Sequence, residues 1–153
     1  MAISGYNYKS FSEVVGLFEN ACTRHLAINN FEYGTLDQLD AKLQNATYPY
    51  IFLRPLSSQG LQNNVRTLQF EMYSLDVPKL TGTDYLGVIS DTEQYVYDII
   101  SYFRDGDYQQ ELWCDLINIT PVNEAFQDRV YGWVSTISYN EEGVYNYCEF
   151  PQL

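Results

Sequence analysis

The chain has few basic residues and a single histidine. Of its 153 residues, 8 are Lys or Arg and 20 are Asp or Glu, which gives a formal net charge of −12. Affinity for nucleic-acid phosphates depends mainly on lysine and arginine, so this balance argues against a protein that grips DNA or RNA. A solvated acidic surface is the simplest interpretation of the charge, and a functional use of its field is the alternative.

Cysteine is also scarce. Cys22, Cys114 and Cys148 are odd in number and far apart in the sequence, which argues against a disulfide framework. The first ten residues lack the charged start and apolar run of a secretory signal, and no stretch reaches the length of a membrane-spanning helix. We therefore expect a soluble chain that folds in a reducing cytoplasm.

Aromatic residues are abundant. Hydrophobic residues make up 46% of the chain and aromatic residues 16%, and 15 residues are tyrosine. This composition and length indicate one folded domain with a core of its own. Tyrosine combines an apolar ring with a polar tip, and a small domain cannot hide fifteen of them. We therefore expect some of the tyrosines to contact a partner.

Two amphipathic helices are predicted. Ser10 and Glu13 form a capping-box pattern at the start of the first, and Ser90 and Glu93 form one at the start of the second. Gly106 ends the second helix. The apolar stripe of the first helix comprises Phe11, Val14, Val15, Phe18, Ala21, Cys22, His25 and Leu26, and that of the second Val96, Ile99, Ile100 and Phe103.

Four strands are predicted from short apolar or alternating segments. The first ends at Pro55 and is followed by a loop over residues 56–63, and residues 78–87 also form a loop. Residues 29–47 are mixed, with Leu36, Leu39 and Leu43 forming either a helical turn or a pinned loop. The strands cover Tyr50–Arg54, Val65–Val77, Leu112–Ile119 and Phe126–Tyr139.

These elements predict an α+β fold, with an antiparallel sheet of about four strands and both amphipathic helices packed on one face. Residues 10–140 would form the domain, residues 1–9 an N-terminal arm and residues 141–153 a C-terminal extension. The opposite face of the sheet would be wet or covered by another subunit.

Few residues suggest a catalytic or metal-binding site. Cys22, His25, Cys114 and Cys148 would be a permitted zinc set, but they lack the close ligand pairs of structural zinc sites. Cys22 and His25 could also pair as nucleophile and base, but no third group to orient them is evident. Buried structural residues are the simpler interpretation.

The acidic residues do not form a recognisable site either. The segment Asp105–Glu111 lacks the glycine placement of a calcium loop, and Asp37 and Asp40 suit a solvated loop better than acid–base catalysis. No phosphate-binding, hydrolase, zinc-protease or dinucleotide motif occurs. We expect no enzymatic activity, no metal and no cofactor.

Five elements follow one another in a recognisable order. They are an N-terminal helix, a strand with a Tyr-Pro start and a closing proline, a longer strand, an acidic-capped helix and a closing strand with a Gly-Trp pair. The last four read YPYIFLRP, FEMYSLDVP, SDTEQYVYDIISYFRDG and DRVYGWVSTISY. This ordered set, which covers most of residues 10–139, resembles the tail-terminator, tail-completion and neck proteins of tailed bacteriophages. The asparagine- and tyrosine-rich composition also resembles that of crAss-like phages.

This resemblance implies a structural virion protein, assembled in the bacterial host cytoplasm, that forms a ring of six or twelve copies at the head–tail junction or tail top. Its partners would be copies of itself and adjacent neck or tail proteins, with DNA passing through unbound and no membrane contact. The alternatives are a non-viral adaptor domain and a small metal-dependent enzyme or regulator. The candidate interface residues are Tyr50, Phe52, Arg54, Tyr73, Arg129, Tyr131, Trp133, Tyr145, Tyr147 and Phe150.

Overall fold

A computed structural model of the chain describes six segments. These are residues 9–43, 45–62, 64–78, 85–105, 112–123 and 130–143. The N-terminal arm before residue 9 and the C-terminal segment after residue 143 lie outside them.

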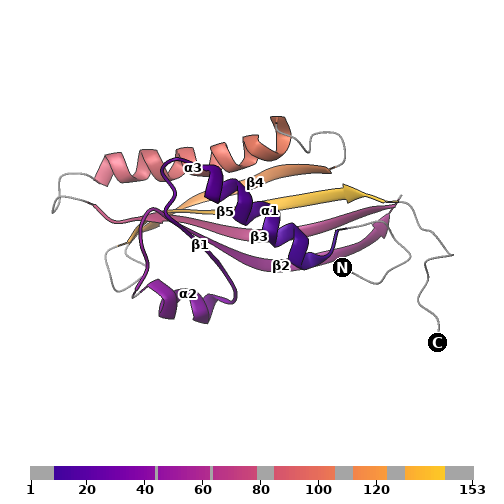
Figure 1. The fold of residues 1–153 in the computed structure, drawn as a ribbon, viewed down its shortest axis with the longest axis horizontal. Coiled ribbons are helices and arrows are strands. Elements are labelled where there is room, and N and C mark those ends of the chain that lie inside the picture. The colour runs from indigo at the N-terminus through magenta and orange to yellow at the C-terminus, as the bar shows by residue number, and fades with distance from the viewer. Residues whose placement is uncertain are drawn as a thin grey trace.

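The described residues form one five-stranded sheet and three helices (Figure 1). In chain order the elements are α1 (Phe11–Arg24), β1 (Asn30–Tyr33), α2 (Leu36–Leu43), β2 (Tyr50–Gln62), β3 (Val65–Asp76), α3 (Tyr85–Asp105), β4 (Leu112–Asn123) and β5 (Tyr131–Glu142). The strand order is β1-β2-β3-β5-β4, and all neighbours are antiparallel except β1 and β2. The α+β class is confirmed. The short parallel strand β1 is an addition to the predicted elements, and α2 is the helical alternative predicted for Leu36, Leu39 and Leu43.

The start of α1 confirms the predicted capping box. The Glu13 amide donates to Ser10 Oγ (3.1 Å), and the Ser10 amide donates to Glu13 Oε1 (3.4 Å). These two bonds satisfy amides that have no partner within the helix. The helix ends at Arg24, so His25 is its C-cap and Leu26 lies beyond it. The predicted apolar stripe is therefore wrong at Leu26, which is fully exposed.

The predicted start of α3 at Ser90 is wrong, because the helix begins at Tyr85. Tertiary contacts hold this extra turn. The Tyr85 ring meets the Tyr131 ring edge-on at 5.0 Å, and Trp133 Nε1 donates to the Ile89 carbonyl (2.8 Å). Packing against β5 thus extends the helix into a segment that reads as a loop in the sequence.

The first predicted strand corresponds to β2, and its predicted end at Pro55 is also wrong, because β2 continues to Gln62. The Gly34 amide donates to the Leu53 carbonyl (3.1 Å), so the backbone hydrogen-bonding groups of Leu53 point to the β1 side of β2. Pro55 lies two residues further on, past the last pair between β1 and β2, which joins Tyr33 to Leu53. Its missing N–H therefore falls on an open edge, where proline is tolerated in a strand.

The two C-terminal strands also extend further than predicted. The strand β4 passes through Pro121 to Asn123 at the outer edge of the sheet. The strand β5 continues to Glu142, past its predicted end at Tyr139. Glu141 is buried there, and its carboxylate accepts bonds from the Arg66 guanidinium (3.3 Å), the Tyr139 hydroxyl (3.3 Å) and the Lys9 amide (3.1 Å).

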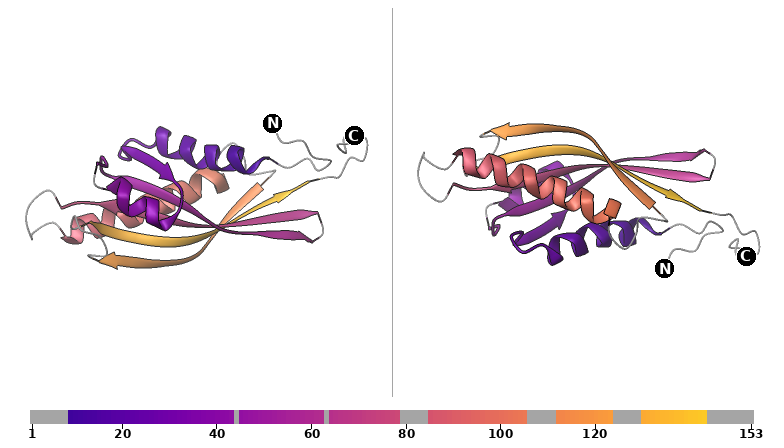
Figure 2. Two further views of the ribbon diagram at one scale, coloured as in Figure 1. Left: turned by 90° about the horizontal axis from the view of Figure 1, so that it is seen from below. Right: turned by 90° about the horizontal axis from the view of Figure 1, so that it is seen from above.

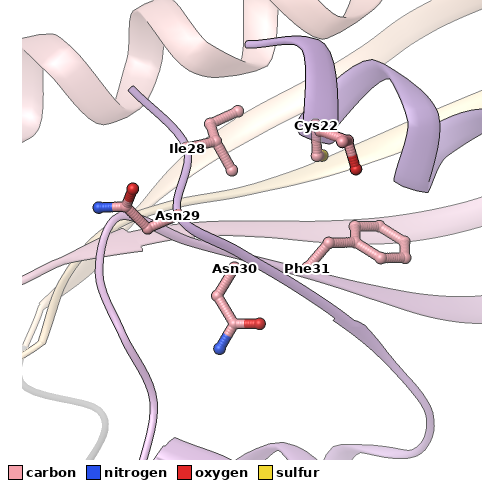
Figure 3. Close-up of a pocket in the computed structure, with 6 residues that line it drawn as sticks. Cys22, Ile28, Asn29, Asn30 and Phe31 are labelled. Atoms are coloured by element: carbon pink, nitrogen blue, oxygen red, sulfur yellow. The ribbon is translucent and has the colours of Figure 1, made fainter. Parts of the chain in front are cut away.

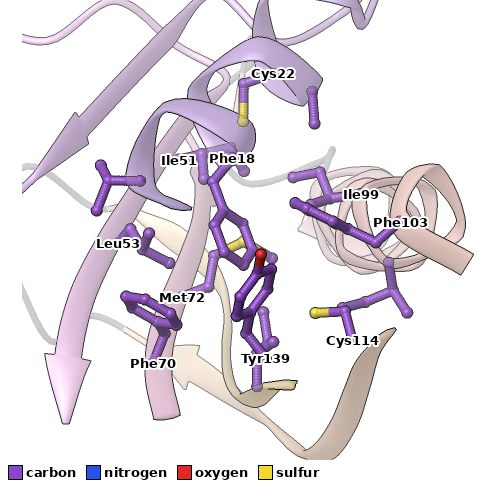
Figure 4. Packing of buried hydrophobic residues seen from close by; sticks show 14 of the residues in the cluster. Phe18, Cys22, Ile51, Leu53, Phe70, Met72, Ile99, Phe103, Cys114 and Tyr139 are labelled. Atoms are coloured by element: carbon purple, nitrogen blue, oxygen red, sulfur yellow. The ribbon is translucent and has the colours of Figure 1, made fainter. Parts of the chain in front are cut away.

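The main core lies between the sheet and the two longer helices. Figure 4 shows Phe18 of α1 among residues of the sheet and α3. Its ring centroid is 5.3 Å from that of Phe70 and 4.7 Å from that of Phe103. This arrangement confirms that α1 and α3 pack on the same sheet face.

A second core lies on the opposite face, beneath α2. In Figure 2, α2 lies in front of the strands in the view from below, and α3 lies in front of them in the view from above. The buried residues of this second core are Leu39, Leu43, Tyr50, Phe52, Tyr73, Leu75, Val122 and Val130. The helix α2 therefore covers part of the face that was expected to be wet or to meet another subunit.

Candidate interface surfaces

Three predicted interface residues are buried within the chain itself. Tyr50 and Phe52 have no exposed surface and Tyr73 has very little, because Leu39 and Leu43 of α2 cover them. Burial raises the pKa of the Tyr50 hydroxyl, and it raises that of Tyr73 to about 12. Burial therefore contradicts the prediction that Tyr50 and Phe52 meet another copy, and Tyr73 keeps very little surface with which to do so.

Arg54 lies where the second core ends. Its guanidinium pairs with Glu71 Oε1 (3.0 Å), and the Tyr73 hydroxyl donates to the same oxygen (2.7 Å). The half of this sheet face beyond α2 carries polar side chains from β3 and β5, with Thr67 Oγ1 donating to Asn140 Oδ1 at 2.8 Å. Arg54 therefore belongs to a hydrogen-bonded polar surface that no described helix covers.

The other predicted interface residues divide into two groups. Tyr131 and Trp133 are half-buried, and both contact the first turns of α3, where they hold that helix on β5. Their exposed parts remain available to a partner. The rest lie outside the described residues, namely Arg129, Tyr145, Tyr147 and Phe150.

The structure exposes large apolar side chains at both edges of the sheet. Tyr33 is the last residue of the edge strand β1 and is 56% exposed, and Leu36 begins α2 three residues later. At the other edge Ile117 of β4 is 56% exposed, at a β-bulge between Leu116 and Asn118. Sequence alternation places the Ile117 side chain on the opposite face of the strand from that of Leu116. Only the strand order shows that this strand lies at an edge of the sheet.

The remaining exposed apolar residues lie on helices and turns. Leu86 is 79% exposed near the start of α3, and Leu26 is fully exposed after α1. Neither was predicted as a surface residue, because the first was assigned to a loop and the second to a helix stripe. Both assignments depended on helix ends, which tertiary packing sets.

Two of the cysteines considered for metal binding or catalysis lie in the core. Cys22 and Cys114 are both buried in the main core, and burial raises the pKa of each thiol, to about 12 for Cys22. A protonated, buried thiol is a poor nucleophile. Cys148 and most of the segment Asp105–Glu111 lie outside the described residues. Within the described part of the chain, no three His, Cys, Asp or Glu residues are close enough to share a metal ion.

His25 has a partner that sequence spacing did not suggest. Its Nε2 lies 2.7 Å from Asp98 Oδ2 of α3, while its Nδ1 accepts a bond from the Ala27 amide (3.1 Å). An amide donor at Nδ1 leaves the ring proton on Nε2, where it is donated to Asp98. The histidine thus joins the end of α1 to α3. Asp98 is 73 residues away in sequence, so only the fold brings the two together.

A partly open pocket lies between the end of α1 and β1 (Figure 3). Its volume is about 290 Å³, and its lining residues are Cys22, Thr23, Ile28, Asn29, Asn30 and Phe31. We call it the α1–β1 pocket. Its lining combines apolar side chains with the amides of two asparagines.

None of the described helices combines the length and the apolar character needed to cross a membrane. No protein-family model matches the chain, and no curated protein matches it either.

Proposed function

We propose that this chain is a structural virion protein that closes into a homo-oligomeric ring at the head–tail junction or tail top of a phage. In this role it links capsid-side and tail-side components, lets DNA pass and catalyses no reaction. The ordered segments that resemble the phage neck and tail-terminator proteins support this proposal. We expect each ring to contain six or twelve copies.

The observation that carries the proposal is the difference between the two edges of the sheet. A ring requires each copy to offer two different surfaces, because one surface must meet another surface of the next copy. Tyr33 and Leu36 lie at the β1 edge, and Ile117 lies at the β4 edge. The chain thus has a distinct apolar surface on each side with which to meet its neighbours.

The charge of the chain suits such a ring. A wall that carries a net negative charge repels phosphates, so DNA passes without being held. Each copy contributes a formal charge of −12. Three of the described cations already pair with carboxylates: Lys42 with Glu32, Arg54 with Glu71 and Arg66 with Glu141.

Electron microscopy of the purified full-length chain tests the proposal. We expect closed rings whose symmetry can be counted in class averages. The variant Ile117→Asp should break the rings, because it places a charge in the apolar contact at the β4 edge. The matched control Ser101→Asp adds the same charge at an exposed position of α3 and should leave the rings intact.

A chain that remains monomeric at micromolar concentration, by microscopy and by sedimentation, would contradict the proposal. That outcome would favour a protein-binding adaptor domain, with its exposed polar sheet face as the binding surface. Rings that are equally intact in both variants would show that the β4 edge is not the contact.

A further inference from the structure

The two ring nitrogens of His25 have opposite roles in the turn between α1 and β1. Nε2 lies 2.7 Å from Asp98 Oδ2 of α3, and Nδ1 accepts a bond from the Ala27 amide (3.1 Å). A carboxylate accepts and a backbone amide donates, so the neutral ring with its proton on Nε2 satisfies both contacts at once. The bond to Ala27 therefore requires that Nδ1 carries no proton.

Protonation of the ring sets these two contacts against each other. Both nitrogens of a protonated imidazole are donors. The contact with Asp98 then becomes an ion pair, and hydrogen bonds that involve charged groups are roughly twice as strong as neutral ones. At Nδ1, by contrast, an N–H faces the N–H of Ala27, and two donors repel. The ring therefore stays with Asp98, and the Ala27 amide loses its acceptor.

His25 is the group in this cluster that responds to pH near neutrality. Its side chain is 20% exposed, so solvent protons reach it. Histidine ordinarily changes charge between pH 5 and 8, whereas carboxylates ordinarily stay charged over that range. The Tyr95 ring meets the imidazole edge-on at 5.3 Å, and burial raises the pKa of the Tyr95 hydroxyl. The carboxylates of Asp91, Asp76 and Asp98 raise it further, so this hydroxyl stays protonated.

The neighbours of the His25–Asp98 pair hold the carboxylate in place. On α3, Gln94 Nε2 donates to Asp98 Oδ1, the oxygen that His25 does not contact (2.8 Å). On α1, Arg24 precedes His25 and is exposed to solvent. Asp98 is thus fixed from its own helix while the charge of the ring changes.

The other end of the turn is held by groups that do not titrate. The Asn29 amide donates to the Pro49 carbonyl (3.0 Å), and Asn29 Nδ2 donates to the Tyr48 carbonyl (2.7 Å). These bonds join amides to backbone carbonyls, so they are independent of pH near neutrality. A change in the charge of His25 therefore acts on residues 26–28, between the two held ends.

We infer that this turn is a pH-sensitive switch, in which protonation of His25 keeps its bond to Asp98, breaks its bond to the Ala27 amide and loosens residues 26–28. Ile28 in this segment is buried in the main core and lines the α1–β1 pocket (Figure 3). The shape of that pocket therefore changes with pH. The switch is a property of the single chain and does not depend on the proposed ring.

Hydrogen exchange of the full-length chain, measured by NMR for single amides, tests the switch. Protection factors remove the ordinary pH dependence of exchange, and the ring resonances of His25 report its protonation. We expect the protection of the Ala27 amide to fall by about fivefold or more between about pH 8 and about pH 5.5, because one hydrogen bond is lost. The Asn29 amide is the internal control and should keep its protection.

Two variants separate the roles of the two nitrogens. His25→Asn supplies a side-chain oxygen that accepts from the amide two residues on and does not titrate, so Ala27 should stay protected at both pH values. His25→Gln supplies a donor for Asp98 and no acceptor at the position of Nδ1, so Ala27 should be weakly protected at both. Thermal unfolding checks that each variant is folded. If a variant does not fold, the comparison of Ala27 with Asn29 in the wild type still decides.

Four outcomes would overturn the inference. Ala27 could keep its protection although the ring resonances show that His25 is protonated, or the ring could take up no proton by about pH 5.5. Equal losses of protection at Ala27 and Asn29 would indicate a general loosening of the region. A His25→Asn variant in which Ala27 still loses protection would show that another group titrates. None of these outcomes bears on ring formation, which microscopy tests.

Discussion

Gly132, half of the Gly-Trp pair in the closing strand, has a steric role. Its φ is +155°, and a Cβ atom built on it would lie 1.8 Å from the Ser74 carbonyl oxygen. Gly132 pairs with Leu75 in the register of β3 and β5, so the strands approach closely beside the second core. Only glycine fits where the backbone of the neighbouring strand occupies the Cβ position.

We expect Gly132→Ala to lower the free energy of unfolding by more than about 2 kcal/mol, because the new methyl group must push the two strands apart. Denaturant titration measures the change. The matched control is Gly16→Ala within α1, where a Cβ atom meets nothing within 4 Å. This second change should raise stability by about 0.5–1 kcal/mol, as alanine does in a helix interior. Equal effects of the two variants would contradict the steric explanation.

Tyr50 buries a hydroxyl group that has no hydrogen-bond partner among the described residues. Such a group has lost its bonds to water without replacing them. We expect Tyr50→Phe to raise the free energy of unfolding by about 1 kcal/mol, since the ring still fills the second core. Denaturant titration measures the gain.

The control is Tyr139→Phe in the main core. The Tyr139 hydroxyl donates to the buried Glu141 carboxylate (3.3 Å), so removing it leaves that charge with one bond fewer. This variant should lower stability by about 1 kcal/mol. A loss of stability in Tyr50→Phe would indicate that the Tyr50 hydroxyl makes a bond after all.

At the scale of elements, α2 decides what the second sheet face does. It presents Leu39 and Leu43 to Tyr50, Phe52 and other aromatic or aliphatic residues that would otherwise form an exposed patch. The face is thus divided into a covered apolar half and an open polar half. The open half, rather than the tyrosines, is what a partner would meet on this side.

We expect Leu39→Ala to lower the free energy of unfolding by about 2–5 kcal/mol, because Leu39 is fully buried and its loss leaves a cavity over Tyr50. The change at Leu36, which is 44% exposed in the same helix, serves as the control. Leu36→Ala should alter stability by no more than about 0.5 kcal/mol. Similar losses from both changes would contradict the view that α2 packs through Leu39.

For the whole molecule, the surfaces that remain open determine how copies can meet. The two edges of the sheet differ from each other, which suits the proposed closed ring. The net charge of −12 opposes contact between copies at low salt. Contact in the proposed ring therefore depends on the shape and apolar character of these two edges.

The sequence alone determined the features that local physics controls. The capping box of Ser10 and Glu13 predicted the start of α1 because its bonds join residues three apart. The alternation of Leu68, Phe70 and Met72 predicted β3 because side-chain direction in a strand repeats every two residues. The same patterns predicted the α+β class and the sheet face on which both long helices pack.

Only the tertiary structure decided which surfaces are free. Pro55 ends a strand in most contexts, but here its missing N–H falls at an open edge; likewise α3 begins at Tyr85 because β5 supports its first turn. Tyr50 and Phe52 are of residue types that are common at interfaces, but they lie in the second core because α2 covers them. In each case the deciding contact joins residues that are distant along the chain, and local sequence patterns carry no information about such contacts.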